Sequence, residues 1–399
     1  MMKRLYFNGK IHSMVSEDDI FSVMVTEGEK ITYTGNEIPS DNFDEKIDLK
    51  GKHMYPTMTD SHLHLLYTIV LAAASFNICE ITADGVKPDN FDDIRKRVDK
   101  YCEENYSQKI ITANGFIISA VNEKRLPTRF ELDEWSDGRA MIVYSIDGHS
   151  SAISTRLMEM LKLPTEDSDG IFSGEAHEFM QGKVTTLIAS NVTPAIIAKG
   201  IANFSNLCAS YGISRVCAMD GNEDVKNDIL TTALAFLAER MDIDVRLFPQ
   251  YMDFSRLDAF KKKQKTLRAG GCGVWELDGS VGSHSAAFNE PYKDSGTQGH
   301  CYYEKDKIKS KVSEALDKNI RLSCHAIGES AIDQITEIYG ELEERIPTSG
   351  AMMRIDHFEF PSQKAVELIR KLPLAITVQP GFANEVDYDV EEKIENTFD

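Results

Sequence analysis

Long apolar runs are absent from this 399-residue chain. A membrane-spanning helix needs about 18 consecutive apolar residues, and the longest candidate, residues 65–78, is interrupted by Ser, Thr, Tyr and Asn. The first residues are basic but lead at once into a strand-and-turn pattern, which is not how a signal peptide continues. The sequence therefore predicts neither a membrane-spanning nor a secreted protein.

Paired cysteines and an excess of positive charge are also missing. The seven cysteines include no CxxC pair, and their odd number argues against a disulfide framework, so the cytoplasm is the expected compartment. Acidic residues outnumber basic residues by 64 to 44, which gives a net charge of −20. Nucleic acid and anionic membranes are therefore not expected as partners.

The composition is that of an ordinary folded protein, with 42% apolar and 27% charged residues. Its length allows two or three domains. The first fifty residues predict short β-strands, since Val23 and Val25 alternate with polar residues while Asn8-Gly9 and Glu27-Gly28-Glu29 predict turns. A region this small must pack against another part of the protein.

Strands and helices alternate after about residue 200. Such alternation predicts a parallel sheet, either closed as a barrel or open and doubly wound. Residues 80–200 are less regular and are interpreted as an insertion or lid, with apolar runs at 110–113 and 141–146. Ile308, Val312 and Leu316 share one helical face, as do Ile332, Ile335 and Tyr339. The strands are predicted at 213–219, 245–249, 274–277, 322–324, 352–355 and 374–378.

The segment Asp60-Ser61-His62-Leu63-His64 is the sharpest local signal. On a strand, residues i and i+2 point to the same side, so His62 and His64 are expected to project together from one strand end. Two imidazoles on one face can share a metal ion, whose nitrogen ligands converge at about 2.0–2.1 Å. A bare HxH motif is also common by chance, and a purely structural role is the alternative.

Two later histidines end predicted strands. His325 follows the run 321–324 and His357 follows the run 353–356, and each precedes a predicted helix. Barrel enzymes place their catalytic groups at the C-terminal ends of strands. Four of the ten histidines at matching strand ends favour a metal site over four separate structural roles.

These motifs resemble the amidohydrolase superfamily, and most closely its YtcJ-like branch, also called amidohydrolase family 3. The segment Pro56-Thr57-Met58-Thr59-Asp60-Ser61-His62-Leu63-His64 resembles the family's strand-one signature. Further matching motifs follow in the family's order and span nearly the whole chain: Leu126-Pro127-Thr128-Arg129, Asp147-Gly148-His149-Ser150, Asp278-Gly279-Ser280-Val281-Gly282-Ser283, His325-Ala326-Ile327-Gly328 and Arg354-Ile355-Asp356-His357.

The resemblance implies an α/β fold with a TIM-like (β/α) barrel of the metal-dependent hydrolase type. The barrel is expected over residues 57–399, with a small β-sandwich portion at 1–56 and an insertion or lid at 76–200 after strand one. The implied reaction is hydrolysis of a non-peptide carbon–nitrogen bond, in an amide, cyclic amide or similar small-molecule substrate, by a metal-activated water. One or two divalent ions are expected, with zinc as the default. The implied ligands are His62, His64, His325 and His357.

The family's bridging lysine, which is carboxylated, is absent. Its position, four residues before the aspartate of Asp-Gly-Ser, is Val274, and no lysine lies nearby. Glu276 has the same strand parity, so its carboxylate can point into the same cavity. It also lies about 6.6 Å nearer the strand end, which offsets its shorter side chain. We hypothesise that Glu276 replaces the lysine as a metal ligand; the alternative is a carboxylate that binds substrate or supports a single ion.

The family's catalytic aspartate, which follows strand eight in a Gly-Ser-Asp context, is the second departure. The sequence reaches Asp399 without that motif, and Asp387 and Asp389 lack its context. The eighth strand is therefore expected to be missing, and residues 384–399 to form a linker or helix. No catalytic residue is assigned, and the activity of the chain is an open question. Exposed sheet edges invite pairing with another chain, so a homo-oligomer is one expectation.

Three further residues are candidates for substrate binding. They are His149 in the Asp-Gly-His-Ser motif, His284 in the loop after the predicted fourth strand, and Gln250 at a strand end. A structural role is the alternative for each. Fold and metal do not fix the substrate, so a phosphoester hydrolase or a deaminase on the same barrel stays open. An impaired or non-catalytic homologue is the third alternative.

Overall fold

The computed structural model describes residues 1–82, 85–106, 108–146, 148–166, 168–189, 194–262, 264–348 and 352–379. Asp147 and the residues from Pro380 onward, among them Asp387, Asp389 and the predicted linker or helix, lie outside these ranges. The chain divides into two compact units, one of residues 1–59 with 212–214 and one of the remaining residues. Among the described residues, no helix is both long and apolar enough to cross a membrane.

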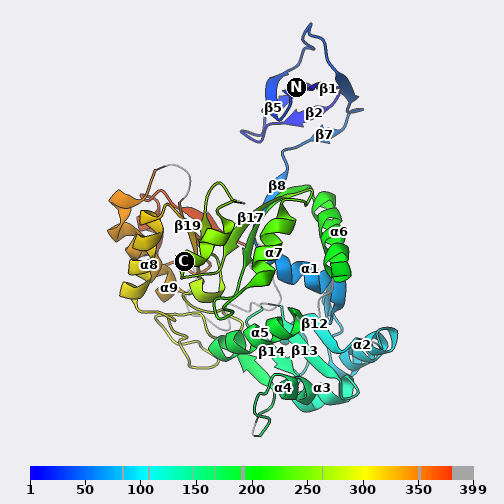
Figure 1. Cartoon of the computed structure of the whole chain (residues 1–399), viewed down its shortest axis with the longest axis vertical. Coiled ribbons are helices and arrows are strands. Elements are labelled where there is room, and N and C mark those ends of the chain that lie inside the picture. The colour runs from blue at the N-terminus through cyan, green and yellow to red at the C-terminus, as the bar shows by residue number, and fades with distance from the viewer. Residues whose placement is uncertain are drawn as a thin grey trace. The chain divides into compact units, whose positions relative to one another are not determined.

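The smaller unit contains two β-sheets (Figure 1). One has the order β5-β4-β1-β6, from β1 (Lys3–Phe7), β4 (Val23–Glu27), β5 (Lys30–Gly35) and β6 (Glu45–Asp48), and the other has the order β3-β2-β7, from β2 (Lys10–His12), β3 (Ile20–Phe21) and β7 (His53–Met54). The predicted strand at Val23 and Val25 is confirmed, and both side chains are buried with Leu5. Gly28, at a φ of +60°, makes the predicted turn between the antiparallel strands β4 and β5.

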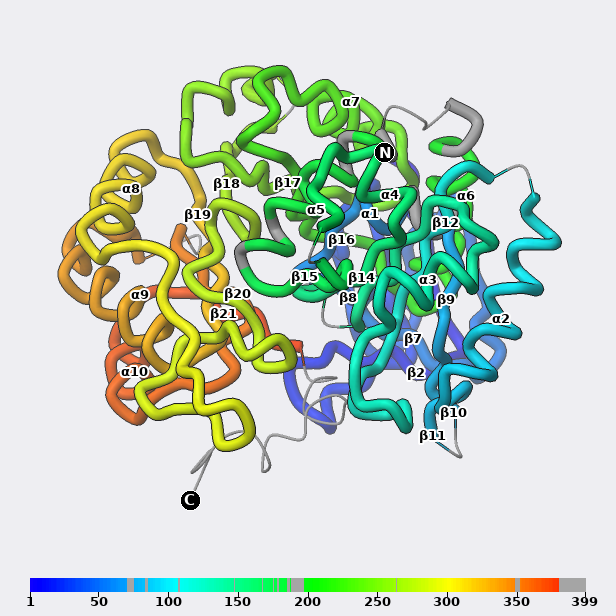
Figure 2. The backbone as a smooth tube through the Cα atoms, turned by 90° about the horizontal axis from the view of Figure 1, so that it is seen from below, coloured from blue at the N-terminus to red at the C-terminus, as the bar shows by residue number. Residues whose placement is uncertain are grey.

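Two further sheets, mainly in the larger unit, carry the candidate site. One has the order β17-β16-β8, from β8 (Met58–Leu63), β16 (Ile213–Asp220) and β17 (Asp244–Pro249). The other has the order β18-β19-β20-β21, from β18 (Arg268–Gly270), β19 (Arg321–Ala326), β20 (Met353–His357) and β21 (Ala375–Thr377). The pair β16–β17 and every pair from β18 to β21 are parallel, and β17 lies beside β18 (Figure 2). Five predicted strands are thus confirmed: those at 213–219, 245–249, 322–324, 352–355 and 374–378.

The strand predicted at 274–277 is wrong. Residues Gly273–Trp275 form a 3-10 turn, and the strand of this part of the sheet is β18, a few residues earlier. Gly270 and Gly271 have φ values of +103° and +101°, so the chain turns sharply out of β18. A Cβ on Gly270 would lie 1.9 Å from the carbonyl oxygen of Ser323. Only glycine, which has no Cβ, avoids this clash. The apolar run at 274–277 packs in the core without forming a strand, and its Trp275 is fully buried.

Helices follow the strands in alternation, as expected of an α/β protein. They are α7 (Ile229–Ala238), α8 (Lys305–Asp317), α9 (Glu329–Glu341) and α10 (Gln363–Ile369). The predicted face of α9 is confirmed, because Ile332, Ile335 and Tyr339 are all fully buried. In α8, Ile308 and Val312 are buried. Figure 2 shows α8, α9 and α10 alongside β19 to β21.

The region predicted as an insertion or lid contains a sheet of its own. Its order is β15-β14-β13-β12-β9, and its apolar runs at 110–113 and 141–146 are strands β12 and β13. Helix α1 precedes this sheet in the chain and helix α6 follows it. The two helices pack against each other, and Gly200 of α6 lies against the backbone of Ile69 in α1. The elements are α1 (Leu65–Ala74), β9 (Ser75–Asn77), β10 (Glu80–Thr82), β11 (Gly85–Lys87), α2 (Phe91–Glu104), β12 (Ile110–Phe116), α3 (Arg129–Trp135), β13 (Ala140–Ser145), β14 (Ser150–Ile153), α4 (Thr155–Met160), β15 (Ile171–Ser173), α5 (Gly174–Ala189) and α6 (Pro194–Ser210).

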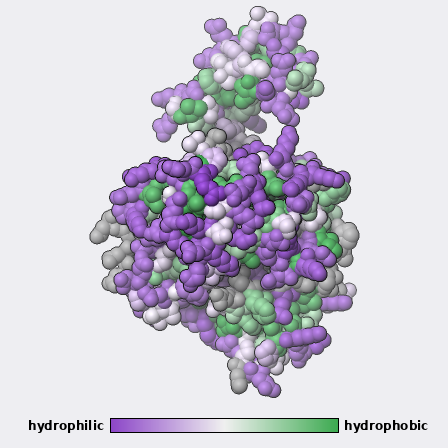
Figure 3. Space-filling model, turned by 60° about the vertical axis from the view of Figure 1, so that its left-hand side comes forward, coloured by the Kyte–Doolittle hydropathy of each residue, from purple (hydrophilic) through white to green (hydrophobic). Residues whose placement is uncertain are grey.

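Hydrophobic side chains gather inside the inserted region. One buried cluster surrounds Ile111 and Val143, and a second surrounds Ile142 and Leu157 on the other face of β13. Hydrophilic residues predominate on the face of the molecule drawn in Figure 3, with hydrophobic residues scattered among them. Burial of both faces of β13 explains why its sequence is a continuous apolar run rather than an alternating one.

Candidate metal centre

The four histidines predicted as ligands all lie at the carboxyl ends of strands. His62 is the second-last residue of β8, and His64 follows that strand directly. His325 is the second-last residue of β19, and His357 is the last residue of β20. The parallel register pairs His325 with Asp356, the neighbour of His357. The two strand ends therefore meet at one edge of the sheet.

Five imidazole rings form a continuous cluster at these strand ends. Ring centroids lie 5.5 Å apart for His62 and His64 and 4.7 Å apart for His62 and His357. The centroids of His325 and His357 are separated by 4.4 Å. The ring of His149, from the loop after β13, lies 5.5 Å from that of His325. The fold thus brings together the four predicted histidine ligands and one predicted substrate-binding residue.

A buried ion pair orients the ring of His62. Its Nδ1 lies 3.1 Å from Oδ2 of Asp356, and Arg354 donates from Nη2 to the same oxygen at 2.9 Å. Because a carboxylate only accepts hydrogen bonds, Nδ1 of His62 is the donor in this contact, and Nε2 is the ring nitrogen that faces away from Asp356. Burial acts to raise the pKa of Asp356, but the hydrogen bond from His62 and the charge of Arg354 together hold that pKa well below its usual range.

A backbone carbonyl orients His64 in the same way. Its Nδ1 lies 3.0 Å from the carbonyl oxygen of Met219, so Nδ1 again carries the proton and Nε2 the lone pair. Burial, reinforced by the neighbouring His62, lowers the pKa of His64 to about 3. The ring is therefore neutral at physiological pH, which is the state in which imidazole binds a metal ion.

His325 tests whether this cluster fits a metal ion. Its side chain is fully buried, and neither ring nitrogen has a hydrogen-bond partner among the residues that the structure describes. Oδ1 of Asp278 lies 3.6 Å from Nδ1, beyond hydrogen-bonding distance. Burial, with His149 and His62 nearby, lowers the pKa of His325 well below its ordinary value. Since a buried polar group without a partner is costly, coordination of a metal ion by a ring nitrogen fits this residue.

The backbone is strained at His357. This residue and Phe358 have φ values of +73° and +51°, a region that residues other than glycine rarely adopt. Nδ1 of His357 lies 3.9 Å from Oε1 of Glu359, and burial beside His325 lowers the pKa of His357 well below its ordinary value. Strain of this kind collects at functional sites, where the surrounding structure fixes a side chain.

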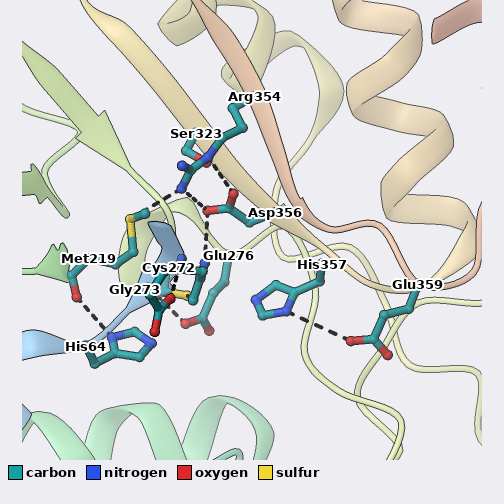
Figure 4. Close-up of polar contacts among 12 residues, drawn as sticks. His64, Met219, Cys272, Gly273, Glu276, Ser323, Arg354, Asp356, His357 and Glu359 are labelled. Atoms are coloured by element: carbon teal, nitrogen blue, oxygen red, sulfur yellow. Dashed lines mark hydrogen bonds and ion pairs between the residues drawn. The ribbon is translucent and has the colours of Figure 1, made fainter. Parts of the chain in front are cut away.

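Glu276 lies at the end of the 3-10 turn that follows β18 (Figure 4). Its side chain is buried, and Oε1 accepts a hydrogen bond from the backbone N–H of Gly273 at 2.8 Å. The strand geometry that predicted its direction is wrong, because residues 273–275 are not extended. The carboxylate nevertheless points toward the cluster, and in Figure 4 it lies between the rings of His64 and His357.

Cys272 is a site residue that the sequence pattern does not reveal. Its Sγ lies 3.4 Å from Nε2 of His62. One possible ligand atom from each of His62, His64 and Cys272 falls within 4.8 Å of the other two. The sequence does contain a signal for this residue, namely a cysteine directly after Gly270-Gly271. The prediction missed it because a strand predicted at 274–277 places the strand end several residues too far along the chain.

The two other predicted substrate-binding residues lie in different surroundings. Gln250 is buried after β17, and its Oε1 would lie 3.0 Å from a Cβ on Gly273, so it packs against the turn that carries Glu276. His284 is held by its own loop, because its Nε2 lies 2.9 and 2.8 Å from the two carboxylate oxygens of Asp294. In the described part of the chain, no ring contact or hydrogen bond joins His284 to the histidine cluster.

Two buried aspartates hold the loops around the cluster. Asp220, the last residue of β16, accepts two backbone N–H groups at the start of α1, directly after His64. Asp278 accepts three backbone N–H groups, one from the loop that follows Asp278 itself and two from the loop that follows β19. Burial raises the pKa of each aspartate to about 7, although these donors act to lower it. The donors are Leu65 (3.1 Å) and Leu66 (2.9 Å) to Asp220, and Ala287 (2.9 Å), Ile327 (3.0 Å) and Gly328 (2.7 Å) to Asp278.

Solved structures with a similar fold include two metal-dependent hydrolases of uncharacterized function. The one from Pyrococcus furiosus matches with a TM-score of 0.68 at 24% identity, covering 98% of this chain and 80% of its own. The one from Pyrococcus horikoshii OT3 matches with a TM-score of 0.69 at 20% identity, covering 98% of this chain and 77% of its own. The likeness supports the α/β metal-dependent hydrolase fold, of TIM-barrel type, that the sequence predicts.

Sequence relatives agree with the fold. The chain is 21% identical to YtcJ of Bacillus subtilis (strain 168), over 96% of this chain and 73% of that protein. It is 18% identical to N-substituted formamide deformylase of Arthrobacter pascens, over 96% of this chain and 74% of that protein. The sequence profile of the amidohydrolase family matches residues 45–397, which is most of the chain. The protein that presents this histidine cluster therefore belongs to the amidohydrolase family.

Proposed function

We propose that the protein is a metal-dependent hydrolase of a non-peptide carbon–nitrogen bond in a small amide, cyclic amide or related substrate. The carrying observation is the cluster of histidines at the strand ends, in which His62 and His64 each place Nδ1 on a fixed acceptor and leave Nε2 for a metal ion. Metal-binding histidines have this arrangement, because the acceptor behind the ring fixes both its tautomer and its orientation.

Five residues would hold the metal: His62, His64, His325, His357 and Glu276. A bound divalent ion supplies a water of lowered pKa and polarises the scissile carbonyl. Imidazole suits zinc, iron, copper and nickel better than magnesium or calcium, and zinc is the ion proposed. Asp356 and the Met219 carbonyl orient two of the ligands, whereas Asp278 holds the loop after His325.

Glu276 takes the part that the family resemblance gives to a lysine. Its buried carboxylate accepts a hydrogen bond from the backbone N–H of Gly273, which fixes the group where it points toward the cluster (Figure 4). A carboxylate brings the negative charge that a carboxylated lysine also brings. Whether one or two ions bind then depends on whether Glu276 contacts both the His62 side and the His325 side of the cluster.

Substrate contacts are proposed for His149, Gln250 and His284. His149 is the best placed of the three, since its ring lies beside His325, and a ring N–H can donate to the substrate oxygen as negative charge develops on it. The relationship to N-substituted formamide deformylase makes N-substituted formamides the first substrates to try.

A substrate panel tests the proposed reaction. Zinc-loaded protein would be offered an N-substituted formamide, a cyclic amide, a dipeptide, an aminopyrimidine and a phosphotriester. We expect hydrolysis of a formamide or cyclic amide that is lost with a chelator and in His325→Ala. His12→Ala is the matched control, because His12 lies in the smaller unit, where it stacks on Tyr55. Preference for the phosphotriester, or release of ammonia from the aminopyrimidine alone, would contradict the proposal.

A further inference from the structure

Cys272 is presented to the histidine cluster by a backbone turn that only glycine permits. The turn begins at Gly270 and Gly271, both with positive φ, where a Cβ would lie 1.9 Å from the Ser323 carbonyl oxygen and 2.3 Å from Sδ of Met219. The backbone of this turn therefore lies unusually close to β19 and to the end of β16. As a result, the residue that follows, Cys272, is buried against His62 instead of facing solvent.

The spacing between sulfur and nitrogen is that of two ligands on one ion. Zinc–sulfur and zinc–nitrogen bonds of about 2.3 and 2.05 Å at a tetrahedral angle separate the two ligand atoms by about 3.6 Å. Sγ of Cys272 and Nε2 of His62 are 3.4 Å apart. His64 completes the group, since all three ligand atoms lie within 4.8 Å of one another.

The orientation of the His62 and His64 rings also supports a shared ion. His62 and His64 use Nδ1 to donate to Asp356 and to the Met219 carbonyl, so the nitrogen of His62 that faces Cys272 is Nε2, which the contact with Asp356 does not use. A thiol could donate a hydrogen bond to this nitrogen in the metal-free protein. The same three atoms can bind a metal ion once the thiol proton has left.

We propose that Cys272 is a metal ligand, which as a thiolate completes a three-residue site with His62 and His64. The inference rests on the proposed function, because it names a further ligand of the same centre. On binding, the sulfur–metal bond replaces the sulfur–hydrogen bond and the proton passes to solvent, since the thiolate is the form that ligates. A thiolate beside imidazoles selects zinc, iron or cobalt and disfavours manganese and magnesium.

Cobalt spectroscopy tests the proposal without relying on activity. Cobalt(II)-loaded wild-type protein should show a near-ultraviolet sulfur-to-cobalt charge-transfer band. The band should be absent from Cys272→Ser and retained in Cys324→Ser. Cys324 is the matched control, because it is also buried and directly precedes His325, but its sulfur lies 3.6 Å from the hydroxyl of Tyr339.

Zinc affinity, measured by competition with a chelator, gives the second readout. Cys272→Ser should weaken binding more than about 100-fold, beyond the 10- to 100-fold loss expected for a residue that only orients a ligand. Wild-type protein that binds cobalt without the charge-transfer band would overturn the role of Cys272 and leave the proposed function standing. Wild-type protein that binds neither cobalt nor zinc would overturn both. Even if Cys272→Ser fails to fold, a wild-type spectrum without the band still overturns the role of Cys272.

Discussion

Replacing Asp356 with asparagine separates its proposed role in orienting His62 for metal binding from its role in stability. The carboxylate accepts from Nδ1 of His62 at 3.1 Å and from Nη2 of Arg354 at 2.9 Å, and it is fully buried. Asparagine keeps the shape but removes the charge, and its NH2 group must face either the Oδ2 position, where both of these donors point, or the Oδ1 position, which lies 2.6 Å from Nε of Arg354. We therefore expect two measurable losses from Asp356→Asn.

The two losses have different sizes. Removing one partner of a buried ion pair costs about 3–5 kcal/mol of unfolding free energy, and the side chain of Arg354 is only 10% exposed. Losing the acceptor behind a metal-binding histidine costs about 10- to 100-fold in metal affinity, or about 1.4–2.7 kcal/mol. Urea unfolding of the metal-free protein measures the first loss, and competition with a chelator for zinc measures the second.

A surface pair provides the control. Arg345 and Asp317 form the same kind of ion pair at 2.8 Å, but their side chains are 40% and 73% exposed. Asp317→Asn should cost about 0–1 kcal/mol and leave zinc affinity unchanged. Zinc affinity of Asp356→Asn within about twofold of wild type would refute the reasoning that Asp356 orients a metal-binding His62, whatever happens to stability.

Three other predictions follow from the same contacts. Gly270→Ala should lower both stability and zinc affinity. The control is Gly138→Ala, which is also at positive φ (+72°) but has no atom within 4 Å of the added Cβ, and it should lower only stability. Urea unfolding and zinc titration measure the two effects, and equal losses of zinc affinity in both variants would contradict the prediction. Hydrogen bonds from Arg125 and Thr128 lower the pKa of Glu131 to about 2, so its contribution to stability is complete above the unfolded value of about 4.3 and is lost as the pH falls towards 2. Glu131→Gln should therefore destabilise at pH 7 but not at pH 2, and an equal effect at both pH values in urea unfolding would count against this assignment. Zinc at about 100 times its dissociation constant should add about 2.7 kcal/mol to the free energy of unfolding, and a melting temperature indifferent to zinc would contradict a site in the folded state.

The histidine cluster is predictable because local patterns report its members. An HxH at a strand end, and single histidines after the apolar runs of β19 and β20, are visible in the sequence and lie where the parallel sheet needs them. The buried face of α9 is equally visible, since Ile332, Ile335 and Tyr339 follow the helical period. In each case one short segment contains the whole signal.

Cys272 and Asp356 show where local patterns stop. β18 has the sequence Arg-Ala-Gly and is followed by a second glycine, so no apolar run marks it as a strand, and the apolar run after it is predicted as the strand instead. The contact between His62 and Asp356 joins residues 294 positions apart. A side chain that orients His62, and a cysteine that follows an unmarked strand, become visible only when the sheet register is known.

Metal content per chain is the most direct test of the central claim. The protein would be purified without chelators or a histidine tag, and its metal measured by elemental mass spectrometry alongside His62→Ala and His325→Ala. We predict at least one equivalent of a divalent transition metal in the wild type and a sharp loss in both variants. A wild type that stays near zero after incubation with zinc or manganese, or variants that keep full occupancy, would contradict the metal centre.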